Sequence, residues 1–429
     1  MALNANSLRG MVDQQTTPEP RRGLSRRARL TITLSVAAAL VLAAGIGATV
    51  ALSLGAKQED AAPAPTPAAT TTPTPEPAEP ELPEPVHVIA MGDMLPHDSV
   101  HHNALQPDGS YDYRGFFAGL QPQLEAADLT FCNLEVPTAG VEFGISGYPV
   151  FNAPTEFARD LHETAGCDLV NTATNHTADK GAAGIAATRG AWDALQPSYV
   201  AGGNRSEEEQ RTIPVAEVDG ITVALVAFAE YSNAPIDGVS LNLMGDEQLV
   251  TDLVTEARSL ADVVIVSAHW GTEDSHEVND QQTAFAQRVA DLGADVVIGT
   301  GPHVLQPVTW LERADGERTL VWYSIGNMLS TQLALPQRTG VIAGFDLVRD
   351  TESGAVSVQD PTAILTYMHY DWTAEQEAAG DLLSRTNLSL TPLAAADPLL
   401  ATTRFGVSAA DQVAASSAIL GPDVTVLPE

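Results

Sequence analysis

Short apolar runs alternate with helix-length amphipathic stretches along this chain, and this alternation restricts the fold more than any other feature. The apolar runs have the length of strands, and Gly, Asp, Asn or His follows most of them. They occupy Val86–Met91, Leu129–Cys132, Leu169–Thr172, Thr222–Ala229, Val263–Val266, Val296–Ile298 and Leu320–Tyr323. The amphipathic stretches cover Phe116–Ala126, Glu156–Thr164, Ala182–Leu195, Glu247–Leu260 and Thr283–Leu292. Strands and helices in this order predict an α/β architecture with largely parallel pairing.

A long uncharged segment, Leu30–Ala56, precedes this region. It exceeds the ~20 residues needed to cross a bilayer, which predicts a transmembrane helix. Five arginines lie in the nine residues before it and only Lys57 follows it directly, so we expect the N-terminus in the cytoplasm and the rest outside. The alternative is a cleaved export signal, because Ser25–Leu30 resembles a twin-arginine signal. The length of the segment favours the membrane helix.

Composition divides the chain into five parts. Nine prolines between Gln58 and Pro85 predict an extended, disordered stalk, because such a segment cannot bury a core. After Gly340 the pattern changes to strands at Val341–Leu347 and Ala363–Met368, a helix near Thr373–Leu383 and an Ala-rich tail. The expected parts are a cytoplasmic basic tail (1–29), a transmembrane helix (30–56), a Pro/Ala/Thr-rich stalk (57–85), the main domain (86–370) and a C-terminal extension (371–429). This organisation predicts a single-pass cell-membrane protein with its C-terminal domain outside the cell.

The charge of the chain limits its partners. The formal net charge is -34 over 429 residues, so its surface repels phosphate backbones and nucleic acid is not an expected ligand. The same charge mildly disfavours capture of a long polyanion and favours retention of divalent cations.

Two cysteines, Cys132 and Cys167, are too few for a disulfide-stapled scaffold. If Asn133 and Asn175 lie side by side on neighbouring strands, the two sulfurs are separated by roughly 20 Å, beyond disulfide reach. Both cysteines are therefore expected to be small core residues.

Polar side chains follow five of the apolar runs. Loops after the carboxyl ends of strands form the ligand crevice of an open α/β sheet, so these residues are expected to converge. Each motif alone also fits a plain structural role, such as a turn or a helix cap, but five together favour a shared site. The motifs are Gly92-Asp93 followed by His97, Asn133-Leu134-Glu135, Asn175-His176 with Asp179, His269-Trp270-Gly271 with Glu273, and Gly301-Pro302-His303. Oxygen and imidazole donors without thiolate suit Mn, Fe or Zn in an open, one- or two-metal site.

These motifs, with Tyr323-Ser324-Ile325-Gly326-Asn327 after them, occur in the order found in the CapA (poly-gamma-glutamate capsule synthesis) family, which the chain resembles from about Val86 to Asn327. That family looks like a branch of the calcineurin-like metallophosphoesterases. The resemblance implies a four-layer α/β/β/α sandwich with mixed sheets. It also implies a metal-dependent phosphoesterase-type site.

The resemblance assigns a role to each motif residue. Asp93 and His303 would hold one metal, Glu135 would bridge, and Asn175 and His269 would serve the second metal. His176 would be the acid or anion-stabilising histidine beside the substrate, with His269 as a second catalytic candidate. Four further residues would contact the substrate or support the metal ligands: His97, Asp179, Glu273 and Asn327.

Two positions depart from the family pattern. Leu95 stands where calcineurin-like enzymes place a histidine, with His97 as a candidate substitute, and Gly301 stands where this family often has the first histidine of His-Pro-His. The second metal is therefore expected to be weakly held or missing.

Two functions follow from the resemblance. The first is metal-assisted hydrolysis of a phosphoester, in the synthesis of poly-gamma-glutamate capsule or another surface polymer. The second is a non-catalytic binding or assembly component of a membrane polymer-synthase or export complex, with a degraded metal site. The ligand would be an anionic polymer or a phosphoester. A doubly wound sugar or peptide binder would show two repeated lobes, and the sequence contains no internal repeat.

Overall fold

A computed structural model describes residues 84–428, which form one compact unit. The predicted cytoplasmic tail, the membrane segment Leu30–Ala56 and nearly all of the stalk lie outside the described residues. Within 84–428 no helix is both long and apolar enough to span a bilayer.

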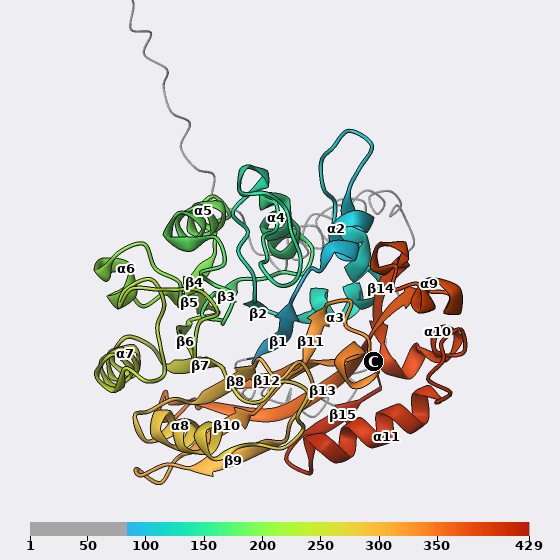
Figure 1. Cartoon of the computed structure of the whole chain (residues 1–429). Coiled ribbons are helices and arrows are strands. Elements are labelled where there is room, and N and C mark those ends of the chain that lie inside the picture. Colours follow the sequence, from blue (N-terminus) through green and yellow to red (C-terminus); the bar gives the residue numbers. More distant parts are fainter. Residues whose placement is uncertain (1–83, 429) are drawn as a thin grey trace, which may run out of the picture. The chain divides into compact units, whose positions relative to one another are not determined.

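Nine strands make the first sheet, which runs in the order β14-β13-β12-β1-β2-β3-β4 with β11 beside β1 and β15 beside β13 (Figure 1). The strands are β1 (Val86–Met94), β2 (Leu129–Leu134), β3 (Leu169–Asn171), β4 (Tyr199–Ala201), β11 (Asn327–Leu329), β12 (Thr339–Arg349), β13 (Val356–Asp371), β14 (Thr386–Pro392) and β15 (Thr425–Leu427). β1 to β4 pair in parallel, whereas β12, β13 and β14 are antiparallel.

Six strands make the second sheet, in the order β5-β6-β7-β8-β10-β9. They are β5 (Val215–Val218), β6 (Ile221–Ala229), β7 (Val263–His269), β8 (Val296–Thr300), β9 (Val308–Glu312) and β10 (Arg318–Trp322). The four central strands are parallel and the two outer pairs are antiparallel. The prediction of mixed α/β sheets is therefore confirmed.

The two sheets face each other across one apolar core. Alternate residues of β1 point to opposite faces, so Val88 and Ala90 enter the core between the sheets while Ile89 and Met91 face outward. Helices α4 and α5 cover the outer face of the first sheet, and α7 and α8 cover that of the second. The helices are α2 (Asp98–Ala104), α3 (Gln121–Ala126), α4 (Thr155–Glu163), α5 (Gly181–Asp193), α6 (Glu207–Arg211), α7 (Glu247–Leu260), α8 (Asp280–Asp291), α9 (Ala374–Ala378), α10 (Asp397–Leu400) and α11 (Ala409–Leu420), with short 3-10 turns η1 (Arg114–Leu120), η2 (Val141–Phe143), η3 (Pro336–Arg338), η4 (Leu382–Ser384) and η5 (Leu393–Ala395).

Local sequence explains the best-defined helices. The Asp246 side chain accepts a hydrogen bond from the Leu249 N–H and caps α7, whose buried Val250, Leu253 and Val254 recur at helical spacing. Asn279 and Gln282 form a reciprocal capping box at the start of α8. Both helices therefore present one apolar face to the second sheet.

Residues after Tyr370 complete the first sheet. β13 runs across the boundary predicted at Tyr370, and both β14 and β15 pair with it. Leu400 and Leu420, from α10 and α11, are buried in the core between the sheets.

Cys132 and Cys167 form a disulfide, so the prediction of two free core thiols is wrong. The error lies in the strand register, because β2 and β3 align Asn133 with Asn171 rather than with Asn175. Cys167 lies in the loop between α4 and β3, and its Cα is 5.5 Å from that of Cys132.

Breaking this disulfide is expected to lower the free energy of unfolding by about 4 kcal/mol, because it closes a loop between residues 35 apart in sequence. Urea unfolding of the oxidised and the reduced chain measures the difference. The paired Cys132→Ala and Cys167→Ala variant is the control, since reductant should not change its stability. Two free thiols in the unreduced, unfolded protein would contradict the assignment.

Candidate metal centre

The end of β1 meets two other strands at one point of the first sheet. Asp93 pairs in register with Asn133 of β2 on one side and with Asn327 of β11 on the other. Gly92 permits this approach, since a β-carbon there would lie 1.8 Å from the Gly326 carbonyl oxygen. The close packing places the Asp93 carboxylate at the carboxyl ends of the parallel strands, where ligand sites of α/β sheets form.

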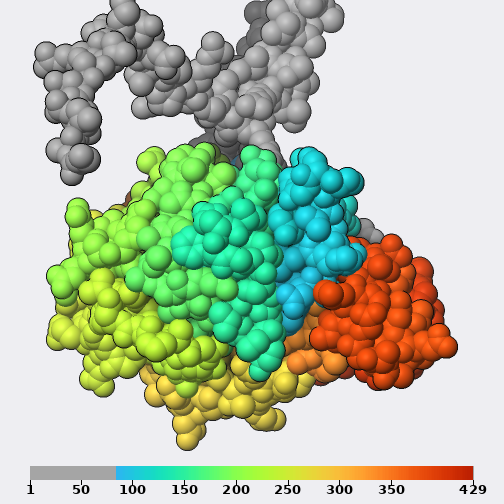
Figure 2. Space-filling model, turned by 45° about the horizontal axis from the view of Figure 1, so that its top comes forward, coloured from blue at the N-terminus to red at the C-terminus, as the bar shows by residue number. Residues whose placement is uncertain are grey.

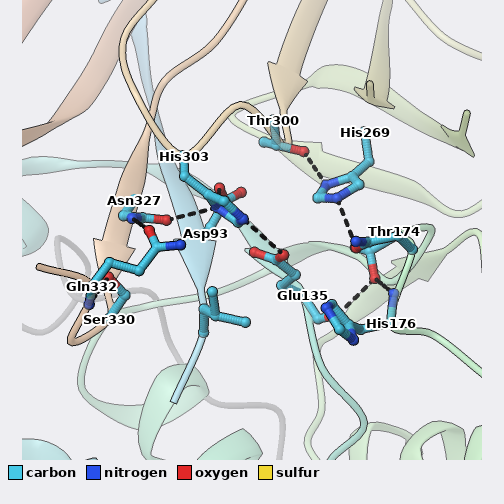
Figure 3. Close-up of polar contacts among 12 residues, drawn as sticks. Asp93, Glu135, Thr174, His176, His269, Thr300, His303, Asn327, Ser330 and Gln332 are labelled. Carbon is cyan, nitrogen blue, oxygen red and sulfur yellow. Dashed lines mark hydrogen bonds and ion pairs between the residues drawn. The ribbon is translucent and has the colours of Figure 1, made fainter. Parts of the chain in front are cut away.

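Three buried side chains converge there. Ligand atoms of Asp93, Glu135 and His303 all lie within 4.8 Å of one another. His303 Nδ1 is 2.9 Å from Asp93 Oδ2, and its Nε2 is 3.8 Å from Glu135 Oε1 (Figure 3). His303 reaches this point because Gly301 and His303 both take left-handed backbone conformations after β8.

Glu135 carries the clearest sign of what the cluster binds. Its side chain is fully buried, and neither carboxylate oxygen has a hydrogen-bond partner within residues 84–428. Burial, and secondly the charge of Asp93, raise the pKa of Glu135 well above its ordinary value. A buried carboxylate without a hydrogen bond is costly, so the residues fit a bound cation that compensates two carboxylates beside an imidazole.

His303 responds to the same charges. Burial alone lowers its pKa, but the negative charges of Glu135 and Asp93 and the hydrogen bond to Asp93 outweigh burial and raise it to about 10. A metal cation at the cluster would take the place of this positive charge.

A chain of amides holds Asp93 in place. Asn133 Nδ2 donates to Asp93 Oδ1 at 2.7 Å, and Asn171 Nδ2 donates to Asn133 Oδ1 at 2.5 Å. On the other side, Asn327 Oδ1 is 3.1 Å from His303 Nδ1, and its Nδ2 donates to Gln332 Oε1 at 2.6 Å. Such secondary contacts orient metal ligands. The role of Asn171 was not predicted from the sequence. The signal available there was that Asn171 is a polar residue near the end of an apolar run.

His269 and Asn175 form a second buried pair. His269 Nε2 is 3.1 Å from Asn175 Oδ1, and its Nδ1 is 3.0 Å from Thr300 Oγ1. Burial lowers the pKa of His269 to about 3, so the ring is a neutral imidazole. The amide oxygen of Asn175 faces the ring and can only accept, so the ring donates from Nε2. Its Nδ1 then accepts from the Thr300 hydroxyl. Thr300 stands directly before Gly301 in the fifth motif, but no role was predicted for it.

His176 lies on the side of Glu135 opposite His303 (Figure 3). Its Nδ1 is 2.7 Å from Asp179 Oδ2, which also accepts the Phe151 N–H at 2.7 Å. The opposite nitrogen, Nε2, lies 3.4 Å from Asn233 Nδ2. Thr174 Oγ1 donates to the Glu135 carbonyl and accepts the His176 N–H, so one residue fixes both. Neither Thr174 nor Asn233 was found from the sequence.

The remaining predicted positions lie around the cluster rather than in it. His97 Nδ1 is 3.1 Å from the Leu95 carbonyl oxygen, and the ring packs edge-on against Phe151. Burial, and then the charge of His303, lower the pKa of His97 to about 3. Glu273 is exposed, yet its charge acts on both Glu135 and His303. His97 and Glu273 therefore border the site.

Both departures from the family pattern have structural reasons. Leu95 is buried in the core that covers the first sheet, where an imidazole would displace apolar packing. A β-carbon at Gly301 would lie 2.8 Å from the Trp270 carbonyl oxygen and 3.3 Å from His269 Nε2. The structure accordingly has room for a glycine alone at position 301.

Gly301→Ala is expected to lower the free energy of unfolding by roughly 1–3 kcal/mol, because its φ of 105° disfavours any side chain. The matched control is Gly190→Ala in α5, where a β-carbon meets open space. There the change should add about 1 kcal/mol of helix stability. Chemical denaturation compares the two variants, and a similar response at both positions contradicts the account of Gly301.

Fold and site together define an α/β protein of two facing mixed sheets, with a buried carboxylate–imidazole centre suited to a divalent cation. The profile of the family described as bacterial capsule synthesis protein PGA_cap matches residues 87–332, and the chain belongs to this family.

Two named relatives are similar to part of the chain. The PGA biosynthesis protein CapA of Bacillus subtilis (strain 168) is 33% identical over an alignment of 190 residues, which covers 42% of this chain and 47% of the relative. The capsule biosynthesis protein CapA of Bacillus anthracis is 30% identical over 175 residues, or 39% and 41% of the two chains. The chain thus spans less than half the length of these relatives.

Solved structures match at lower identity. A hypothetical protein from Thermus thermophilus has a TM-score of 0.39 and 18% identity, covering 65% of this chain and 99% of its own. A 5'-nucleotidase from Candida albicans SC5314 has a TM-score of 0.38 and 11% identity, covering 65% and 51%.

Proposed function

We propose that this chain is a metal-dependent phosphoesterase-type hydrolase that acts outside the cell membrane in the synthesis of a capsule or related surface polymer. The fully buried carboxylate of Glu135 carries the proposal, because it has no hydrogen-bond partner within residues 84–428 and lies within 4.8 Å of ligand atoms of Asp93 and His303. The names of the two CapA relatives support the capsule role.

The roles of the residues follow from their positions. Asp93, Glu135 and His303 hold a divalent cation, with Mn, Zn and Fe all suited to these donors. When bound, such a cation polarises a phosphoryl oxygen and lowers the pKa of water. The neutral His269–Asn175 pair offers hydrogen-bond donors, and no carboxylate among residues 84–428 forms a metal-binding group with it.

His176 is the proposed general acid. Its Nδ1 proton is directed to Asp179, and its Nε2 lies on the side of Asn233. When both ring nitrogens carry a proton, Asp179 stabilises the imidazolium, and the Nε2 proton can pass to the oxygen of a leaving group to leave a neutral imidazole. Tyr231 is exposed, and the Asn175 side chain acts on its hydroxyl, so Tyr231 adds a polar group near Asn175.

Two observations support a location outside the cytoplasm. The disulfide between Cys132 and Cys167 persists in oxidising compartments and is rare in the cytosol. The uncharged Leu30–Ala56 segment, with arginines before it, supports a single-pass membrane anchor. A membrane polymer-synthase complex is then the proposed partner, with an anionic polymer or a phosphoester as ligand and no nucleic acid.

A non-catalytic assembly role is the second candidate. Leu95 and Gly301 supply no metal ligand, so the site has fewer metal ligands than the family pattern, which favours a role without catalysis. Hydrolysis of bis-p-nitrophenyl phosphate by the manganese-loaded chain decides between the two. Turnover that Asp93→Asn abolishes supports the enzyme. If the wild-type chain turns the ester over no faster than Asp93→Asn does, and a membrane synthase co-purifies with it, the assembly role is supported.

A further inference from the structure

A cavity lies in the part of the chain beyond the family match. It has a volume of about 290 Å³ and is lined in part by Arg338, Tyr370, Trp372, Arg404 and Phe405. Arg338 and Tyr370 are buried, whereas Arg404 is exposed, so the two buried residues form its floor and Arg404 its rim. Figure 2 shows this C-terminal segment, in orange to red, next to the blue segment that contains α2.

Arg338 is a buried cation that has no counter-ion within residues 84–428. Its guanidinium donates to the Met368 carbonyl oxygen at 2.9 Å and to Tyr367 Oη at 2.7 Å, and its Cζ lies 3.9 Å from the centre of the Tyr370 ring. Among residues 84–428 no carboxylate lies within ion-pair distance of Arg338. Buried charges are normally paired, so this one calls for a partner.

Arg385 adds a second buried cation. Its Cζ lies 5.1 Å from the centre of the Tyr370 ring and 4.7 Å from that of Trp372. Its Nη1 donates to the Thr331 carbonyl oxygen at 2.6 Å, while its buried Nε has no partner within residues 84–428. Burial lowers the pKa of Arg385, and the charge of Arg338 acts in the same direction. Tyr370 therefore separates two cations in a strongly acidic chain.

The carboxylates that line the cavity are already engaged. Glu377 forms an ion pair of 2.7 Å with Arg404. Asp371 accepts from Asn387 Nδ2 at 2.6 Å and lies 3.0 Å from His369 Nε2. Arg404, the other arginine that lines the cavity, is paired with Glu377. Arg338 is therefore the lining residue that an incoming anion can pair with.

We propose that this cavity is a second ligand site, and that Arg338 binds the carboxylate of a small peptide or of a polymer chain end. A guanidinium fork matches the planar carboxylate, and the Tyr370, Trp372 and Phe405 rings provide flat walls for the attached carbon chain. The volume is close to the ~300 Å³ at the lower end of small-molecule pockets, which favours an amino-acid- or dipeptide-sized group.

Gln332 and Asn327 connect the cavity to the metal centre. The Tyr370 hydroxyl donates to the Gln332 carbonyl oxygen at 2.9 Å. The side chain of the same Gln332 accepts from Asn327, which contacts His303 (Figure 3). A chain-like ligand held at Arg338 would therefore lie next to the loop that supports the metal centre.

Calorimetric titration of the full-length chain with γ-linked triglutamate, in EDTA, tests the site. Only the choice of a γ-linked probe rests on the proposed function. Arg338→Gln should weaken binding by roughly tenfold or more, as expected for loss of a charge-assisted hydrogen bond. Arg318→Gln is the matched control, because Arg318 also lacks a carboxylate partner within residues 84–428 but lies on β10, where it packs on Trp310. Its affinity should equal that of wild type.

Further arms keep the test decisive. Arg404→Gln, at the exposed rim, should fold normally and also weaken binding, since it frees Glu377 to repel the anion. Tighter binding of γ-linked than of α-linked triglutamate assigns the site to the polymer end, and equal binding assigns it to peptide carboxylates in general. Both outcomes support the site, and neither depends on phosphoester hydrolysis.

Three results would overturn it. The first is unchanged affinity in both Arg338→Gln and Arg404→Gln. The second is binding of inorganic phosphate but of neither peptide. The third is loss of binding in Asp93→Asn, which would place the peptide at the metal centre instead.

Discussion

Asp93→Asn and Glu135→Gln are each expected to remove the bound divalent ion while the fold is kept. Both replacements preserve shape and remove one negative charge from a cluster whose ligand atoms lie within 4.8 Å. With one carboxylate left beside His303, the cluster no longer balances a divalent charge. Metal analysis should give about one ion per wild-type chain and background levels in both variants.

Thermal unfolding provides an independent readout of the same change. A metal present at 100 times its dissociation constant stabilises the wild type by about 2.7 kcal/mol and should not stabilise the variants. In EDTA, Glu135→Gln should be at least as stable as wild type, because it removes a buried carboxylate that has no hydrogen-bond partner within residues 84–428.

Glu256→Gln is the control, since Glu256 is an exposed carboxylate on α7. It should bind metal as wild type does. A wild-type chain without metal, or equal metal in all variants, would remove the basis of the proposed hydrolase.

His176→Asn is expected to lower kcat for phosphoester hydrolysis by roughly 10²–10⁴-fold, with no change in metal content. The loss should be large for an alkyl phosphate ester, whose leaving oxygen needs a proton. It should be small for a p-nitrophenyl ester, whose leaving group departs as a stable anion. Steady-state kinetics with both substrates measures the contrast.

The contrast separates proton donation from a merely structural role. Asp179→Asn should show a smaller loss with the same dependence on leaving group, because Asp179 orients His176 through Nδ1. His102→Ala is the control, since His102 is exposed on α2. Equal losses with both esters in His176→Asn would rule out the acid role.

The central part of the fold was predictable because periodicity and local capping agree there. α7 has the bounds Glu247–Leu260 expected from its spacing of apolar residues, and Asp246 marks its start. β14 and β15 were not predicted, because Thr386–Pro392 and Thr425–Leu427 are short and carry a weak pattern. Their position depends on pairing with β13, which no local signal encodes.

The site was predictable to the extent that its residues follow strands. Asp93, Glu135 and His303 stand at or just after strand ends and do meet. The disulfide was missed because β3 ends at Asn171, four residues before the motif used to set the register. Thr174 and Arg338 were missed because their roles depend on partners from distant segments.

The outer edge of β13 is covered by two separate pieces of the chain. β14 covers Thr366–Asp371, and β15 covers Thr362–Ile364. β13 is complete at Asp371 whereas β15 ends at Leu427, so part of this edge is protected only after synthesis has passed Leu427. An emerging chain, or one cut before Thr425, would present unpaired backbone groups there, which invite pairing with another molecule. Correct assembly of the first sheet thus depends on a segment made well after the strand that it protects.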